Sequence, residues 1–196
     1  MGKEEGIERR CLRGTLFVSS RSGREGFWRS FENEDHLSGV KERIRTRCIP
    51  CIENLYRQLK AGETEIEVGN AYDCWKVVVV LNSDDECEKV LEEYQNTFLP
   101  SRHIQGRYGS HAEGGAKAII ANADDETERD LLLSEFRECV RKSGLDARIF
   151  YTKGCANLYG ETLGDWRKWR RVTRIRDVKN VDAVMKIVER YLGLSE

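Results

Sequence analysis

The chain has 196 residues, of which 39% are hydrophobic and 34% are charged, and only two are proline. This length and composition predict one folded domain with a substantial core, and they exclude a disordered or fibrous chain. The formal net charge is −1. It excludes a protein that binds polyanions over its whole surface, so a basic binding surface has to be local.

We expect a single α+β domain over residues 1–196, with residues 1–13 as a loosely ordered N-terminal segment. No apolar run approaches the roughly 20 residues that cross a bilayer, and the first residues lack the apolar core of a secretory signal. These patterns predict a cytoplasmic protein without a membrane segment. The seven cysteines are an odd number, which favours reduced thiols over a disulfide framework.

The first predicted elements lie before residue 70. Gly14 to Ser20 reads as a strand, a helix is expected to start after Pro50 and to end at Gly62, and the alternation from Thr64 to Val68 predicts a half-buried strand.

One Cys-x-x-Cys, Cys48-Ile-Pro-Cys51, lies where this helix is expected to begin. A thiol at a helix start can have a lowered pKa, and the motif resembles that of thioredoxin-like redox proteins. A thiol-based oxidoreductase using Cys48 and Cys51 is therefore an alternative function. That motif normally follows a buried apolar strand, however, and here Glu42 to Arg47 is mostly charged.

A zinc site would need two ligands besides this pair. The spacing of the other cysteines and the histidines matches no zinc finger or ribbon. We therefore expect no metal site and no cofactor.

A near-repeat of about 40 residues is the strongest internal signal. Trp75 to Phe98 and Ala116 to Val140 each contain an apolar run, then Asn-x-Asp-Asp-Glu, then an amphipathic segment. Each copy predicts a strand, a cap and a helix. Ser83 or Asp84 caps the first helix, and Asp124 or Asp125 caps the second. Gly144 is expected to end the second helix.

Three further elements are predicted. His103 to Gly115 reads as a strand that runs into a Gly-rich, hairpin-like loop without a phosphate-binding fingerprint. Ala147 to Tyr151 reads as a strand, and Asn180 to Gly193 as an amphipathic terminal helix.

The segment from Gly164 to Arg176, GDWRKWRRVTRIR, has the most unusual composition. From Trp166 onward it has six Lys or Arg residues and no acid. One interpretation is structural, with one Trp in the core and the arginines solvated. The other is nucleic-acid contact, because basic side chains neutralise phosphates and an aromatic face stacks on a base. If the segment is extended, one Trp points inward and the other outward.

From Trp75 to Trp169 the order of features is similar to that of a known family. The features are the apolar run after Trp75, AEGGAKAII, DDETE, SGLDARIFYTKG, and Gly160 followed by Trp166. They resemble the basophilic-leukaemia-expressed protein family, whose fold is that of the messenger-RNA cap-binding initiation factor. The resemblance implies a curved, mostly antiparallel sheet backed by helices on one face. Neither the surroundings of Trp28 nor those of Trp166 and Trp169 match the cap-binding motifs, and we expect Trp75 in the core.

No set of catalytic residues emerges from the sequence, so we expect a non-enzymatic binding domain. Its partner is RNA or a nucleotide, with an acidic protein partner as the other option. The expected contact residues are Trp166, Arg167, Lys168, Trp169, Arg170, Arg171 and Lys153.

Overall fold

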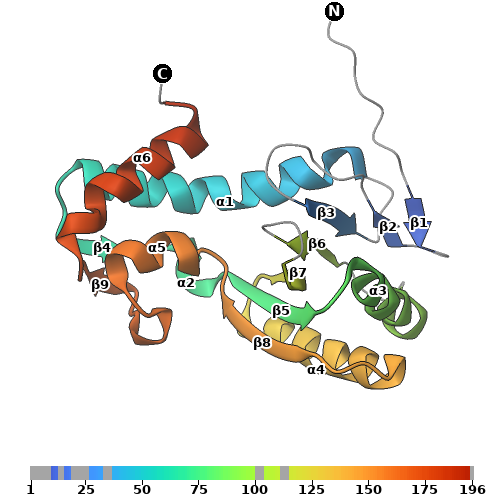
Figure 1. Cartoon of the computed structure of the whole chain (residues 1–196). Coiled ribbons are helices and arrows are strands. Elements are labelled where there is room, and N and C mark those ends of the chain that lie inside the picture. The colour runs from blue at the N-terminus through green and yellow to red at the C-terminus, as the bar shows by residue number, and fades with distance from the viewer. Residues whose placement is uncertain are drawn as a thin grey trace, which may run out of the picture. The chain divides into compact units, whose positions relative to one another are not determined.

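A computed structural model of the whole chain was analysed (Figure 1). It describes residues 10–12, 16–18, 27–32, 37–99, 104–110 and 115–194. The chain divides into two compact units, residues 1–44 with 76–151 (unit 1) and residues 45–75 with 152–196 (unit 2). The expected α+β class is confirmed.

Unit 1 contains a mostly antiparallel sheet of strand order β1-β2-β3-β6-β7-β5-β8. The pairs β1/β2, β2/β3, β3/β6 and β6/β7 are antiparallel. The strands are β1 (Arg10–Leu12), β2 (Leu16–Val18), β3 (Phe27–Glu32), β5 (Trp75–Leu81), β6 (Gln105–Ser110), β7 (Lys117–Ala123) and β8 (Arg148–Lys153).

Two helices back this sheet, as the near-repeat predicts. α3 (Asp84–Phe98) follows β5, and α4 (Glu126–Ser143) follows β7. They lie side by side in Figure 1. The order β5-α3-β6-β7-α4-β8 is a split βαβ arrangement, in which each helix returns the chain to the sheet.

The predicted caps of both helices are confirmed. Ser83 Oγ accepts a hydrogen bond from the N–H of Glu86 at 3.1 Å, and Asp125 Oδ1 accepts one from the N–H of Glu128 at 2.7 Å. The Glu86 side chain also accepts a hydrogen bond from the N–H of Asn82, and the Glu128 side chain accepts one from the N–H of Asp124. Asn82 and Asp124 are the residues just before the two caps. These reciprocal bonds resemble a capping box.

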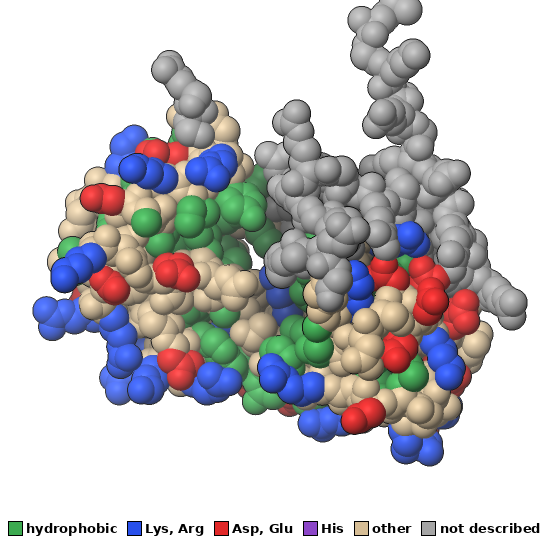
Figure 2. Space-filling view, viewed as in Figure 1, with side chains coloured by type: hydrophobic (Ala, Val, Ile, Leu, Met, Phe, Trp, Pro, Cys, Tyr) green, Lys and Arg blue, Asp and Glu red, His purple; other side chains and the backbone are tan. Residues whose placement is uncertain are grey.

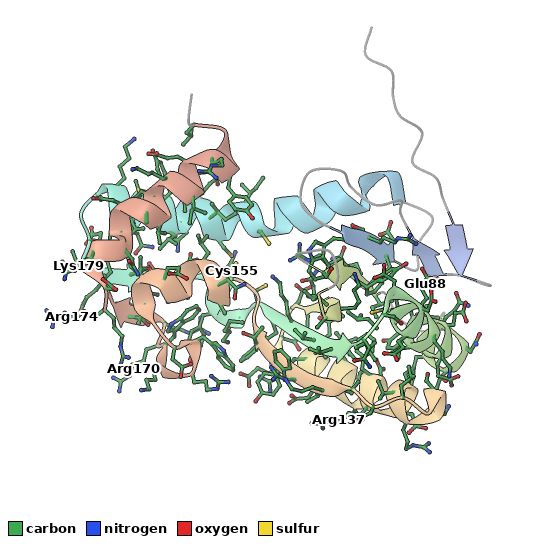
Figure 3. The ribbon with its side chains drawn as sticks, viewed as in Figure 1. Glu88, Arg137, Cys155, Arg170, Arg174 and Lys179 are labelled. Carbon is green, nitrogen blue, oxygen red and sulfur yellow. The ribbon has the colours of Figure 1, made fainter. Side chains whose placement is uncertain are left out.

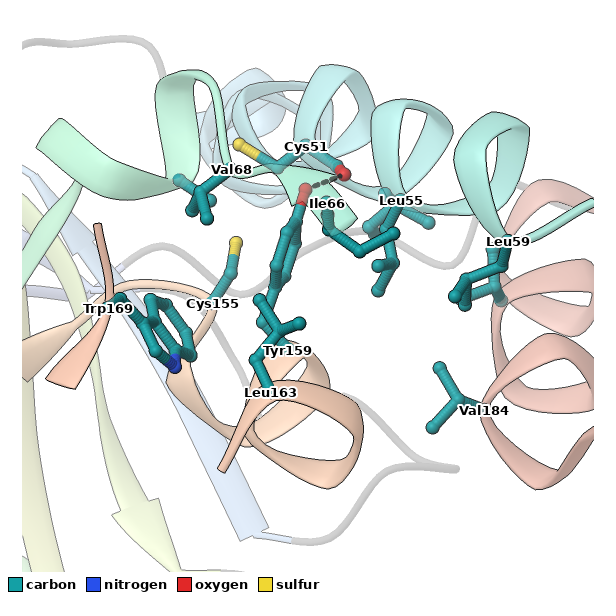
Figure 4. Close-up of a cluster of buried hydrophobic side chains, with 13 residues drawn as sticks. Cys51, Leu55, Leu59, Ile66, Val68, Cys155, Tyr159, Leu163, Trp169 and Val184 are labelled. Atoms are coloured by element: carbon teal, nitrogen blue, oxygen red, sulfur yellow. Dashed lines mark hydrogen bonds between the residues drawn. The ribbon is translucent and has the colours of Figure 1, made fainter. Parts of the chain in front are cut away.

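Unit 2 is built on one buried cluster, drawn in Figure 4. Tyr159 and Trp169 are among its aromatic members, and Leu55, Leu59 and Val184 are among its aliphatic ones. The elements of this unit are the C-terminal part of α1 (Leu37–Lys60), β4 (Glu65–Glu67), α2 (Asn70–Asp73), α5 (Ala156–Leu163), η1 (Trp166–Lys168), β9 (Val172–Arg174), η2 (Val178–Asn180) and α6 (Val181–Leu192). β4 and β9 pair antiparallel.

Most predicted elements after residue 60 are confirmed, but the start of α1 was wrong. The helix begins at Leu37, so Pro50 lies inside it rather than before it. Within the expected loose segment 1–13, residues 10–12 form β1, and the others lie outside the described residues. None of the described helices is long and apolar enough to span a membrane.

Candidate nucleic-acid interface

The basic strip, Trp166 to Arg176, consists of η1, the turn after it, and β9. Asp165 starts η1, because its Oδ1 accepts a hydrogen bond from the N–H of Arg167 at 3.1 Å. This backbone bond, together with the nearby charge of Arg167, holds the pKa of Asp165 below its ordinary value. The only carboxylate beside η1 in the sequence is thus already engaged locally.

Trp169 belongs to the core. Its side chain is 5% exposed, and its Nε1 donates to the carbonyl of Gly164 at 3.0 Å. The ring lies 5.8 Å from that of Tyr159, centroid to centroid. Trp169 therefore anchors the strip and is not available to stack on a ligand.

Trp166 is the aromatic side chain of the strip that reaches the surface. It is half-buried, and its ring meets that of Trp75 edge to face, with centroids 5.7 Å apart. The guanidinium of Arg167 lies 4.8 Å from the centre of the Trp166 ring. The two tryptophans lie in and just after the 3-10 turn η1, not in the extended chain on which the expected inward–outward division rested, and both contact the core cluster of unit 2, Trp169 fully and Trp166 in part. The expected burial of Trp75 is confirmed.

The basic side chains of the strip are exposed, but they differ in their partners. Arg167 pairs with Asp165 at 3.2 Å, and Arg171 pairs with Asp73 at 3.2 Å. No ion pair within the described ranges involves the following exposed residues: Lys168, Arg170, Arg174, Arg176 and Lys179. Figure 3 shows the labelled side chains of Arg170, Arg174 and Lys179 pointing outward from unit 2.

Charge is divided unequally between the units. Unit 2 has 14 Lys and Arg against 11 Asp and Glu, a formal charge of +3, whereas unit 1 has 19 against 23, a formal charge of −4. In Figure 2, Lys and Arg side chains gather on the part of the surface where Figure 1 places β9. The nearly neutral chain thus contains a locally positive unit, as the sequence suggested.

Lys153 does not lie on this surface. Its side chain is 5% exposed, and its ammonium group donates to the carbonyl of Tyr72. The same group lies over the Trp75 ring, 3.3 Å from its centre. We expected Lys153 to contact nucleic acid, but its burial removes it from the candidate surface.

The Cys-x-Pro-Cys motif lies inside α1 rather than at a helix start. Cys51 is buried and Cys48 is half-buried. The first turn of α1 is remote from both in sequence, so its free N–H groups cannot stabilise either thiolate. The motif therefore lacks the position at a helix start on which the alternative redox function rested.

Cys155, just before α5, lies near this motif. A hydrogen bond with Cys48 lowers its pKa, whereas a hydrogen bond with Cys51 and burial raise it, and the result is a pKa of about 12. A thiol with such a pKa is almost entirely protonated at neutral pH and is a weak nucleophile.

Three basic residues were missed when the contact set was chosen from the sequence: Arg174, Arg176 and Lys179. The signal for the first two was the alternation in Arg171-Val-Thr-Arg-Ile-Arg176. Arg174 lies in β9 and Arg176 follows two residues later, and both side chains are exposed. The signal for Lys179 was weaker, because its exposure depends on the turn η2.

Comparisons with known proteins give no further identification. No protein-family model matches the chain, and a search of curated proteins finds no match. The resemblance to the basophilic-leukaemia-expressed protein family stays a prediction.

Proposed function

We propose that the protein is a non-enzymatic domain that binds single-stranded RNA through the basic strip of unit 2 and the neighbouring Lys179. The observation that supports this most is the row of exposed cations that have no carboxylate partner among the described residues. It occurs on a unit with a formal charge of +3.

Unpaired cations are the residues that bind phosphates most effectively. Arg167 and Arg171 each share their charge with an aspartate at 3.2 Å, so a phosphate would have to compete for them. Lys168, Arg170, Arg174 and Arg176 form no ion pair with a described residue. Each phosphate they neutralise would release a condensed counterion, which drives binding at low salt.

The local structure favours a single strand over a duplex. η1 and β9 each have three residues, so neither can fill a groove as a recognition helix or a long ribbon does. Trp166 offers one partly exposed ring, on which an unpaired base could stack in place of Arg167. Such stacking contributes about 1–3 kcal/mol per base.

The proposal is tested by reversing two of the unpaired charges. Arg170→Glu/Arg174→Glu should weaken binding of a fluorescent single-stranded RNA at least about ten-fold at fixed salt, measured by anisotropy. The matched control is Arg137→Glu/Arg148→Glu, which changes the charge equally at two exposed positions of unit 1. Absence of RNA binding by the unaltered chain, or equal losses in both variants, would contradict the proposal.

A further inference from the structure

Tyr72, in α2 of unit 2, repeats the arrangement found at Trp166. The guanidinium of Arg171 lies 5.2 Å from the centre of the half-buried Tyr72 ring. The same guanidinium pairs with Asp73, the next residue after Tyr72, at 3.2 Å. At Trp166 the arginine over the ring likewise pairs with an aspartate adjacent to the ring in sequence. Unit 2 thus has two half-buried rings, each covered by an arginine that an aspartate holds.

The pairing of β4 with β9 brings Tyr72 to the basic strip. The N–H of Val68, just after β4, donates to the carbonyl of Arg171, just before β9, at 2.8 Å. Gly69 then has a φ of 57°, a left-handed conformation that favours glycine, and turns the chain into α2. Tyr72 therefore lies beside the strip although the two segments are far apart in sequence.

Tyr72 and Trp166 adjoin the same buried pair, Trp75 and Lys153. The Trp166 ring meets that of Trp75 edge to face, with centroids 5.7 Å apart. The Lys153 ammonium lies 3.3 Å from the centre of the Trp75 ring and 4.6 Å from that of Tyr72. Lys153 is buried and Arg171 is exposed, so Arg171 covers Tyr72 on the side toward solvent. Buried groups thus hold both rings from within, and exposed arginines cover them from outside.

Tyr151 of unit 1 shows a fixed form of the same contact. The guanidinium of Arg129 lies 4.5 Å from the centre of the Tyr151 ring, but the Arg129 side chain is only 10% exposed. It also donates two hydrogen bonds to Asp130, of 2.8 and 3.0 Å. The Arg167 and Arg171 side chains are 68% and 72% exposed. Exposed ion pairs and exposed cation–π contacts are weak, so these two arginines can leave their rings at little cost.

We propose that Tyr72 and Trp166 are two stacking positions for bases of one RNA strand. This inference rests on the proposed binding of RNA by the basic strip. Stacking on a base is stronger than the exposed cation–π contact that it replaces, so Arg171 and Arg167 move aside when bases bind. Each released guanidinium can then bind a phosphate of the same strand. The ligand is a strand with at least two unpaired bases, because the bases of a duplex cannot reach the two rings.

A strand without bases tests the inference on the unaltered full chain. Fluorescent oligouridine and a strand of abasic spacers with the same length and charge are compared by anisotropy at fixed salt. Oligouridine should bind at least about ten-fold more tightly, because the abasic strand keeps the phosphate contacts but loses both stacking contacts. Equal affinities would overturn the inference and leave the proposed RNA binding intact. Binding of neither strand would overturn both.

Single substitutions then locate the two positions. Tyr72→Leu and Trp166→Leu should each weaken oligouridine binding about five-fold or more and leave the affinity for the abasic strand unchanged. Tyr72→Phe keeps the ring and should bind oligouridine as the unaltered chain does. The matched control is Tyr151→Leu, which removes the ring of the fixed contact in unit 1 and should change neither affinity.

The two strands together separate stacking from a general disturbance of the surface. Unchanged oligouridine binding by Tyr72→Leu would overturn the assignment of Tyr72. Equal losses for both strands would also overturn it, because they would show that the substitution alters the phosphate contacts instead of a stacked base. A loss in Tyr151→Leu as large as in Tyr72→Leu would contradict the placement of the bases on unit 2.

Discussion

Trp169 connects the basic strip to the core of unit 2. Of the two tryptophans in the strip, this one is buried, and its indole N–H is bonded to the carbonyl of Gly164. The sequence predicted one inward Trp but could not say which, because both have similar neighbours. The choice depends on η1, whose three-residue turn was not foreseen and which directs Trp169 toward Tyr159.

Substitution of Trp169 should separate its packing from its hydrogen bond. Trp169→Ala should lower the free energy of unfolding by about 3–5 kcal/mol, because it removes a large buried ring. Trp169→Phe keeps an aromatic ring but leaves the Gly164 carbonyl without its donor, with a loss nearer 1–2 kcal/mol. Urea unfolding followed by circular dichroism measures both. An unfolding midpoint unchanged by Trp169→Ala would contradict the anchoring role.

Cys87 should make stability depend on alkaline pH. Burial, with the nearby carboxylates of Asp84 and Glu86, raises its pKa from 9.0 to about 12, so folding favours the neutral thiol. The stabilisation from this preference is fully present below pH 9 and is lost as the pH rises toward 12.

The unfolding free energies of the unaltered chain and of Cys87→Ala should therefore converge at high pH. Between pH 8 and pH 10.5 their difference should shrink by about 1–2 kcal/mol. The exposed substitution Ser134→Ala, in α4, serves as the control and should keep a constant difference from the unaltered chain. A constant difference for Cys87→Ala as well would show that its thiol is not desolvated in solution.

At the scale of the elements, prediction succeeded where short-range signals agree. Each copy of the near-repeat has its apolar run, its cap and its amphipathic segment within about 25 residues, and the structure places β5-α3 and β7-α4 there. α1 shows where such signals fail. The helix was expected to start after Pro50, but it begins at Leu37 and Pro50 lies inside it.

The two caps should contribute similar stability, because they make the same bonds. Ser83→Ala and Asp125→Ala each remove a side-chain acceptor from a helix start, at a cost of about 1 kcal/mol. Ser134→Ala lies in the interior of α4, where alanine has the higher helix propensity, and should not destabilise the helix. Thermal unfolding of the three variants measures the contrast, and a loss at Ser134 as large as at Ser83 would contradict the capping role.

At the scale of the whole molecule, sequence reasoning recognised the α+β class and the local basic charge but not the contacts between segments far apart in the chain. Cys74 and Gly154 are 80 positions apart, yet the N–H of Gly154 donates to the carbonyl of Cys74 at 2.8 Å. Spacing along the chain carries no signal for this contact. The burial of Lys153 was missed for the same reason, since Tyr72 and Trp75 cover it from a distant segment.

The proposed binding of RNA by unit 2 is a claim about charge, so its dependence on salt is the most direct test. If about five unpaired cations each neutralise one phosphate of a single strand, the logarithm of the binding constant should fall against the logarithm of salt concentration with a slope near −3.5. Arg170→Glu/Arg174→Glu should make that slope shallower by about 1.4, whereas Arg137→Glu/Arg148→Glu should leave it unchanged. Binding that does not vary with salt, or a slope that both variants alter equally, would contradict the account.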